Sequence, residues 1–218
     1  LSNSIVYAYQ TPEFLKDMGT PSRLSKARNI YENRFRDDGN NKVICFDRDG
    51  TLNKCMEGEY ITNVDSFKLI EGVSEAVSTL RNLGFFLVCV TNQPVIARGD
   101  ISLDGLSAIH LKMDWLLGVE NAYFDGIYFC PHHTDSGYEG EIIELKFDCE
   151  CRKPKTGLLR QVMCDMPFDR QKSWFIGDSW RDIKCGKSFE MRTCSIGEEE
   201  LGADVKVANL LDFAKKLK

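Results

Sequence analysis

The sequence contains no long apolar run, no basic surplus and only six prolines. No stretch approaches the roughly 20 apolar residues that a membrane helix needs, so we expect no membrane span. Residues 1–5 lack the basic region and apolar core that begin a secretory signal, and we therefore expect a cytoplasmic location. The formal net charge of −5 argues against nucleic acid as a partner, because surfaces that bind nucleic acid are usually basic.

Cysteine, by contrast, is abundant, with nine among 218 residues. In a chain without a secretory signal, cysteines are interpreted as reduced thiols or metal ligands before disulfides. Cys45 and Cys89 lie in apolar runs and Cys164 lies on a predicted helix face, so we expect all three to be buried structural thiols. The cysteines between residues 130 and 151 follow a different pattern, close to histidine and to each other.

Short apolar segments alternate with segments of helical spacing after residue 41. The apolar segments predict β-strands at 42–46, 85–90, 124–129 and 173–176, and edge strands at 191–196 and 205–207. Apolar residues recur at helical spacing over 73–83, 103–117, 157–163 and 210–217. This alternation predicts an α/β fold, a doubly wound, Rossmann-like parallel sheet with right-handed crossovers.

The first 41 residues differ from the rest of the chain. Residues 34–42 are rich in Asp, Asn and Gly and have no apolar periodicity, which is typical of a linker. We therefore predict an N-terminal extension and linker at 1–41, followed by one domain at 42–218.

Polar side chains follow three of the predicted strands. The pairs at these strand ends are Asp47 and Asp49, Thr91 and Asn92, and Asp178 and Asp182. In an open parallel sheet, ligands bind at the carboxyl ends of the strands, near the point where strand order reverses. We therefore expect one site that combines these groups.

Asp47 and Asp49 form the acid pair that hydrolysis of a phosphate ester requires. One carboxylate can attack phosphorus to form an aspartyl-phosphate, and a second acid can protonate the leaving oxygen and then activate water. Asp178 adds a hard oxygen ligand suited to Mg²⁺. The alternative for Asp47 and Asp49 is a solvated turn, since Asp and Gly are common turn residues; three polar strand ends in one sheet argue against it.

Four segments resemble, in order, the motifs of the haloacid dehalogenase (HAD) superfamily of phosphohydrolases. These segments are Asp47-Arg-Asp-Gly-Thr51, Thr91, Lys153, and Gly177-Asp178 with Asp182, within residues 42–200. Three longer segments are similar to the branch of heptose-1,7-bisphosphate phosphatases and histidinol phosphatases: Asp47–Asn53, Thr91–Gly99, and Cys130-Pro-His-His133 with Cys149-Glu-Cys-Arg-Lys-Pro154. Only Lys54–Gly72 follows the first motif before the next helix, so the resemblance implies a capless member.

The resemblance implies a role for each matching residue. Asp47 would be the nucleophile and a Mg²⁺ ligand, and Asp178 would complete the metal site. Asp49 would be the general acid and base, with its backbone carbonyl also at the metal. Thr91 and the backbone of Asn92 would hold the transferring phosphoryl group.

Basic residues would hold the charges of the substrate. Lys153 would be the cation beside the transferring phosphoryl group, with Asp182 orienting it, and Arg152 would contact a second phosphate. Further candidates for polyol or phosphate contacts are Asn53, Gln93 and Arg98. Each of these three could instead be an ordinary turn residue.

A Cys-x-His and a Cys-x-Cys segment lie 16 residues apart. Their ligands, Cys130, His132, Cys149 and Cys151, would form a closed tetrahedral zinc site, which is structural rather than catalytic. The resemblance supports this site, which would fix the direction in which Arg152 and Lys153 leave the loop. Unmetallated thiols or a disulfide are the alternatives.

The other two histidines have different expected roles. His133 competes with His132 as a ligand, but the resemblance favours His132 and leaves His133 behind the ligands or at the surface. His110 lies on a predicted helix face, and we expect it to be structural.

The sequence thus predicts a Mg²⁺-dependent phosphatase for a small phosphorylated sugar. The first hypothesis is removal of the 7-phosphate of D-glycero-D-manno-heptose 1,7-bisphosphate in the synthesis of nucleotide-activated heptose. Histidinol phosphate is the alternative substrate, and a regulatory or scaffolding partner of a sugar nucleotidyltransferase is the alternative outside the enzymes. Residues 7–24 resemble the closing segment of such nucleotidyltransferases, which implies a fused or associated domain; an unrelated N-terminal helix is the other interpretation.

Overall fold

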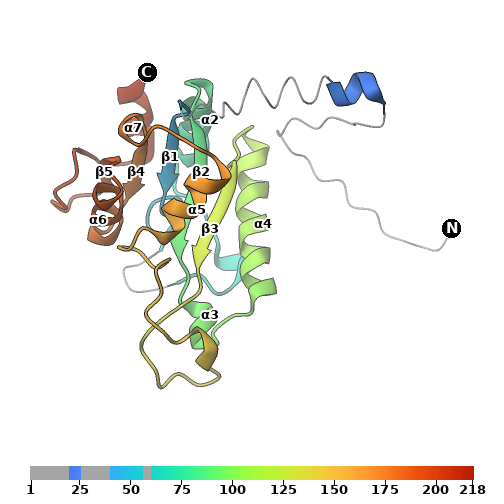
Figure 1. The fold of residues 1–218 in the computed structure, drawn as a ribbon, viewed down its shortest axis with the longest axis vertical. Helices are drawn as coiled ribbons and strands as arrows, with labels where there is room; N and C mark the ends of the chain where they lie inside the picture. Colours follow the sequence, from blue (N-terminus) through green and yellow to red (C-terminus); the bar gives the residue numbers. More distant parts are fainter. Residues whose placement is uncertain (1–19, 26–39, 56–59) are drawn as a thin grey trace.

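A computed structural model describes residues 20–25, 40–55 and 60–218 (Figure 1). Most of the predicted extension at 1–41 lies outside the described residues, and so does most of the segment 7–24. Between the first strand and the next α-helix, the described residues form one short 3-10 helix, Val64–Ser66, and no cap domain.

Six parallel strands form one sheet in the order β3-β2-β1-β4-β5-β6. Their bounds are β1 Val43–Phe46, β2 Phe86–Asn92, β3 Gly126–Cys130, β4 Trp174–Gly177, β5 Arg192–Ile196 and β6 Val205–Val207. The prediction of a doubly wound parallel sheet is confirmed. The prediction of β5 as an edge strand is wrong, because β5 pairs with β4 on one side and β6 on the other.

Helices cover both faces of the sheet (Figure 1). Their bounds are α2 Val73–Asn82, α3 Val95–Arg98, α4 Leu103–Val119, α5 Gly157–Asp165, α6 Trp180–Ser188 and α7 Leu210–Leu217, with short 3-10 helices at Ile143–Leu145 and Arg170–Lys172. The short helix α3 and the helix α6 were not predicted. None of the described helices combines the length and apolar character that crossing a bilayer requires.

Side-chain alternation along β1 explains why the sheet has two cores. Ile44 and Phe46 pack with α2, α4 and α7 on one face, whereas Val43 and Cys45 pack with α5 and α6 on the other. Both faces are buried, so β1 is a continuous apolar run, as expected of a central parallel strand. Cys164 is exposed because the buried face of α5 is formed by other residues, so its predicted burial is wrong.

Strand order reverses at β1. The chain runs from β1 through β2 to β3 on one side, and then crosses to β4, β5 and β6 on the other. The carboxyl ends of β1 and β4 therefore mark the switch point at which open α/β sheets bind ligands.

Candidate active site

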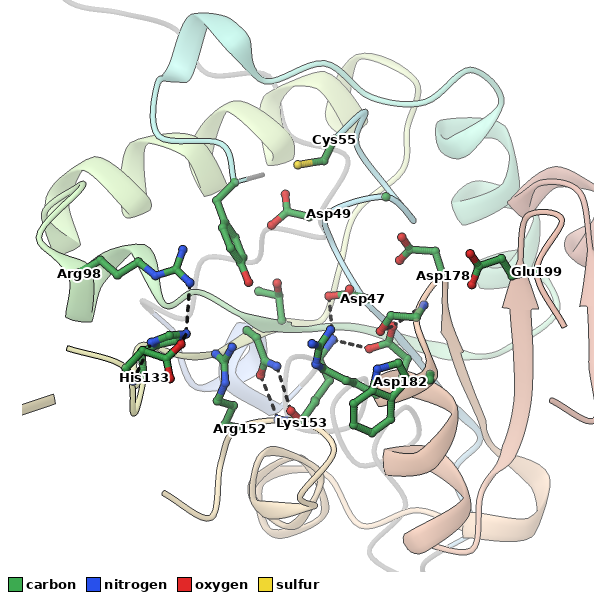
Figure 2. Close-up of a pocket in the computed structure, with 18 residues that line it drawn as sticks. Asp47, Asp49, Cys55, Arg98, His133, Arg152, Lys153, Asp178, Asp182 and Glu199 are labelled. Carbon is green, nitrogen blue, oxygen red and sulfur yellow. Dashed lines mark hydrogen bonds and ion pairs between the residues drawn. The ribbon is translucent and has the colours of Figure 1, made fainter. Parts of the chain in front are cut away.

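A cavity of about 530 Å³ opens at the carboxyl ends of the central strands (Figure 2). The predicted site residues that line it are Asp47, Asp49, Thr91, Asn92, Arg98, Arg152, Lys153, Asp178 and Asp182. The structure thus brings the three predicted strand ends together. The volume of the cavity lies in the range usual for small-molecule sites.

Asp47 follows β1 and faces this cavity. Its Oδ1 forms an ion pair with Lys153 Nζ at 2.7 Å and accepts a hydrogen bond from the Arg48 backbone N–H at 2.7 Å. Burial raises the pKa of Asp47 to about 7; Lys153 opposes this rise, and the carboxylates of Asp182 and Asp178 add to it. The carboxylate therefore has one cation and several like charges as neighbours.

Lys153 lies between two carboxylates. Its Nζ is 2.7 Å from Asp47 Oδ1 and 2.7 Å from Asp182 Oδ1, and only 2% of the side chain is exposed. Burial alone would lower the pKa of Lys153, but Asp182 and Asp47 outweigh burial and raise it, so the ammonium stays charged. The Asn92 side chain holds the Lys153 backbone, accepting from its N–H at 3.0 Å and donating to its carbonyl at 3.1 Å.

The carboxylates of Asp47, Asp178 and Asp182 form a cluster with the chemistry of a Mg²⁺ site. One oxygen of each lies within 4.8 Å of the others. Burial and then Asp182 raise the pKa of Asp178 to about 6, as expected where like charges gather. Oxygen ligands and a local excess of negative charge fit a hard divalent cation.

Glycine at position 50 lets the turn after β1 approach Asp178. Its φ of +83° is unfavourable for other residues, and a Cβ there would lie 2.0 Å from Asp178 Oδ2. A larger residue would therefore displace one member of the carboxylate cluster.

Asp49 is the predicted metal ligand whose carboxylate lies outside this cluster. Its oxygens instead accept hydrogen bonds from Arg48, from Asn53 Nδ2 at 3.0 Å and from Gln93 Nε2 at 2.8 Å. Asp182 takes its place in the cluster, although Asp182 also pairs with Lys153. The predicted metal contact of Asp49 is through its backbone carbonyl rather than this carboxylate, and it stays a prediction.

Asn53 and Gln93 were predicted to contact substrate, but neither lines the cavity. Both side chains are completely buried, and both donate to Asp49. Gln93 Nε2 also donates to Thr91 Oγ1 at 3.0 Å, which links Asp49 to the predicted phosphate-binding threonine. The structure therefore places these two amides behind Asp49, where they support the site rather than contact a ligand.

Arg98, Arg152 and His133 lie on the opposite side of the cavity from Asp178 (Figure 2). Arg98 Nη2 is 3.1 Å from His133 Nε2, and the guanidinium lies 5.4 Å from the centre of the Tyr60 ring. Among the residues that the structure describes, no partner is found for the buried Arg98 Nε. Burial, Arg98 and Arg152 lower the pKa of His133. Asp135 also lines the cavity here, with its Oδ2 3.6 Å from His133 Nε2, so the two arginines and this one carboxylate leave this side with a net positive charge.

The loop from β3 to α5 gathers Cys130, His132, Cys149 and Cys151. The three sulfur atoms lie 3.2–3.5 Å from one another, too far apart for disulfides. His132 Nδ1 lies 3.6 Å and 3.1 Å from two of them. Ligands about 2.3 Å from a tetrahedral centre lie roughly 3.8 Å apart, so this cluster is close to the geometry of a metal site.

Arg48 and His133 are the site residues whose positions could not be predicted from the sequence. A basic residue inside an acidic turn is usually solvated, but the Arg48 side chain is completely buried. His133 is 6% exposed and lines the cavity, so it lies neither at the surface nor in the cysteine cluster. For His133, the only signal in the sequence was its position directly after another histidine.

Comparisons with known proteins agree with this site. A HAD-hydrolase-like family model matches residues 150–208. The D-glycero-beta-D-manno-heptose-1,7-bisphosphate 7-phosphatase of Haemophilus influenzae is 39% identical over 186 residues, covering 82% of this chain and 97% of that protein. The enzymes of the same name from Yersinia pestis and Escherichia coli K12 are 36% and 33% identical, each over 81% of this chain.

Solved structures show the same fold. The D,D-heptose 1,7-bisphosphate phosphatase of B. bronchiseptica, crystallised with magnesium and phosphate, superimposes with a TM-score of 0.69 at 26% identity and covers 81% of this chain and 97% of that one. A HAD-like phosphatase from Mesorhizobium loti gives a TM-score of 0.70 at 25% identity, over 82% of this chain and 88% of that one. This chain therefore belongs to the HAD-type phosphatases, in the family of the D-glycero-beta-D-manno-heptose-1,7-bisphosphate 7-phosphatases.

Proposed function

We propose that this protein removes the 7-phosphate of D-glycero-β-D-manno-heptose 1,7-bisphosphate, a step in the synthesis of nucleotide-activated heptose. The observation that carries the proposal is a cavity with two separate regions that could each take a phosphate. One is the carboxylate cluster with Lys153, which has the chemistry of a Mg²⁺ site, and the other is the pair of arginines, Arg98 and Arg152, across from Asp178. A bisphosphate needs a reaction site for one phosphate and a binding site for the other. The names of the relatives give the sugar and its anomer.

The reaction is proposed to proceed in two steps on the chain's own acids. An oxygen of Asp47 forms a bond to phosphorus as the bond from phosphorus to the sugar oxygen breaks. Asp49 gives a proton to the departing sugar oxygen. Asp49 then takes a proton from water, whose oxygen attacks phosphorus and releases inorganic phosphate and free Asp47. Asp49 is thereby left protonated for the next cycle.

The surrounding groups would hold the phosphoryl group during both steps. Thr91 and the backbone of Asn92 line the cavity beside Asp47 and would donate to phosphoryl oxygens. Lys153, oriented by Asp182, would neutralise developing charge. Asp47, Asp178 and the Asp49 backbone carbonyl would hold Mg²⁺, which would supply the remaining neutralisation of phosphoryl oxygens.

A substrate panel tests the choice of sugar. With Mg²⁺ present, we expect kcat/KM for the β-heptose 1,7-bisphosphate to exceed that for histidinol phosphate by about 100-fold, because only a second phosphate can use the distal arginines. The α-anomer and the 7-monophosphate complete the panel. Faster turnover of histidinol phosphate would overturn the proposed substrate, and a preference for the α-anomer would correct the assignment of the anomer.

Arg98 provides a sharper test of how the second phosphate is bound. Replacing it by glutamine removes the charge and the fork of donors, and we expect kcat/KM for the bisphosphate to fall about 100-fold, mainly through KM. The 7-monophosphate should change less than about threefold, since it makes no distal contact. Arg160→Gln, on the exposed side of α5, is the matched control. Equal losses on both substrates would show that Arg98 does not bind the second phosphate.

The proposal also covers a second metal, the location and the domain organisation. Cys130, His132, Cys149 and Cys151 are proposed to bind structural zinc, because three thiols this close favour a divalent cation that offsets their negative charge when deprotonated. A cytoplasmic location is supported by nine cysteines that form no disulfide. The division into an extension at 1–41 and a phosphatase domain at 42–218, and a fused or associated nucleotidyltransferase, remain proposals from the sequence.

A further inference from the structure

Arg48 lies between the two proposed catalytic acids, yet its side chain points into the protein. None of it is exposed, and it is the largest fully buried side chain in the part of the chain that the structure describes. A guanidinium without water must be paired, because an unpaired buried charge is strongly destabilising. Its two partners are Asp49, next in sequence, and His110 on α4.

The contact with Asp49 is a bidentate ion pair. Arg48 Nη2 lies 3.0 Å from Asp49 Oδ1 and 2.9 Å from Oδ2, and Nε lies 3.2 Å from Oδ1. Asn53 and Gln93 donate to the same carboxylate, one to each oxygen. Donors on both oxygens fix the rotation of the carboxylate, which a single contact would leave free.

The contact with His110 holds the guanidinium from behind. His110 is 8% exposed, and its Nε2 lies 3.2 Å from Arg48 Nη1. Burial and then Arg48 lower the pKa of His110 to about 4, so the ring is neutral near pH 7 and Nε2 can accept this hydrogen bond. The ring also packs 5.9 Å from Phe129 at the end of β3.

We infer that Arg48, anchored by His110, is a positioning residue that sets the orientation of Asp49 for proton transfer to the leaving group. This inference rests on the proposed function, in which Asp49 is the general acid. His110 then has a functional role as well as the structural one expected from the sequence. The connection runs from α4 through the Arg48 side chain to the acid. In the described part of the chain, no side-chain hydrogen bond or ion pair of Arg48 reaches the carboxylate cluster or the distal arginines, and Arg48 meets the cluster only through its backbone N–H, which donates to Asp47 Oδ1.

The choice of leaving group separates positioning from general damage. An alkyl phosphate ester needs a proton on its departing oxygen. 4-Nitrophenyl phosphate releases a stable anion and needs little protonation of its leaving oxygen. We expect Arg48→Lys, which keeps the charge but not the fork, to raise the ratio of kcat/KM for 4-nitrophenyl phosphate to that for the fastest sugar phosphate about 100-fold. Asp49→Asn, measured in parallel, should raise the same ratio at least as much.

A pair of variants at His110 tests the anchor. His110→Leu fills similar space without an acceptor and should raise the ratio of kcat/KM for 4-nitrophenyl phosphate to that for the sugar phosphate about tenfold. His110→Gln retains an acceptor and should keep this ratio within about threefold of the wild-type value. Thermal unfolding of each variant shows whether the fold persists. An unchanged ratio in Arg48→Lys beside a raised ratio in Asp49→Asn overturns the inference, and an unchanged ratio in Asp49→Asn overturns the proposed acid role instead. Equal ratios in the two His110 variants would remove His110 from the connection.

Discussion

Replacement of Asp47 by asparagine is expected to lower kcat about 10⁴-fold or more with every phosphate ester, because the proposed nucleophile is lost. The amide is a poor nucleophile at phosphorus, and none of its neighbours can substitute for it. Asp182 is paired with Lys153 at 2.7 Å, and the Asp49 carboxylate is held by Arg48. The loss should appear in turnover and persist at saturating substrate.

The fold should survive this change. The amide has almost the shape of the carboxylate, and its oxygen can still accept the hydrogen bond from the Arg48 backbone N–H. Asp104→Asn, at an exposed position in the first turn of α4, is the matched control and should retain full activity. Acid-quenched wild-type protein should carry phosphate from labelled substrate, and Asp47→Asn should carry none. Activity above a tenth of wild type in the presence of Mg²⁺ would contradict both the mechanism and the choice of nucleophile.

Loss of one ligand of the proposed zinc site is expected to have the second largest effect, on stability as well as on activity. Cys151→Ser should release the metal and lower the midpoint of thermal unfolding by about 10 °C, because structural zinc contributes several kcal/mol to folding. Activity should fall about 100-fold, since Arg152 and Lys153 follow Cys151 directly and lose their fixed direction. Lys153 would then no longer be held between Asp47 and Asp182.

Cys164→Ser separates this effect from the loss of any thiol. Cys164 is exposed on α5 and lies outside the cysteine cluster, so its replacement should leave metal content, midpoint and activity unchanged. Metal content is measured on the purified wild-type protein in the same experiment. Less than half an equivalent of zinc in the wild type, or a Cys151→Ser variant that melts like the wild type, would leave the cluster as unmetallated thiols.

The local pattern of the chain was enough to predict most of the framework. Alternating apolar and helical segments predicted the parallel sheet, because strands buried on both faces must be apolar throughout and each crossover needs a helix. Observed strand and helix ends differ from the predicted ones by a few residues. The acidic turn after β1 and the Cys-x-His and Cys-x-Cys segments were also visible, since their chemistry depends on spacing within short segments.

Other features depended on which distant segments meet in space. Asn53 and Gln93 were expected in the cavity, but the turn after β1 and the end of β2 bring them behind Asp49, where they are completely buried. Arg48 could be buried only because α4 places His110 against it and Asp49 balances its charge. β5 became an internal strand through its pairing with β6. Burial and pairing across the sheet are properties of three-dimensional packing, and no local spacing encodes them.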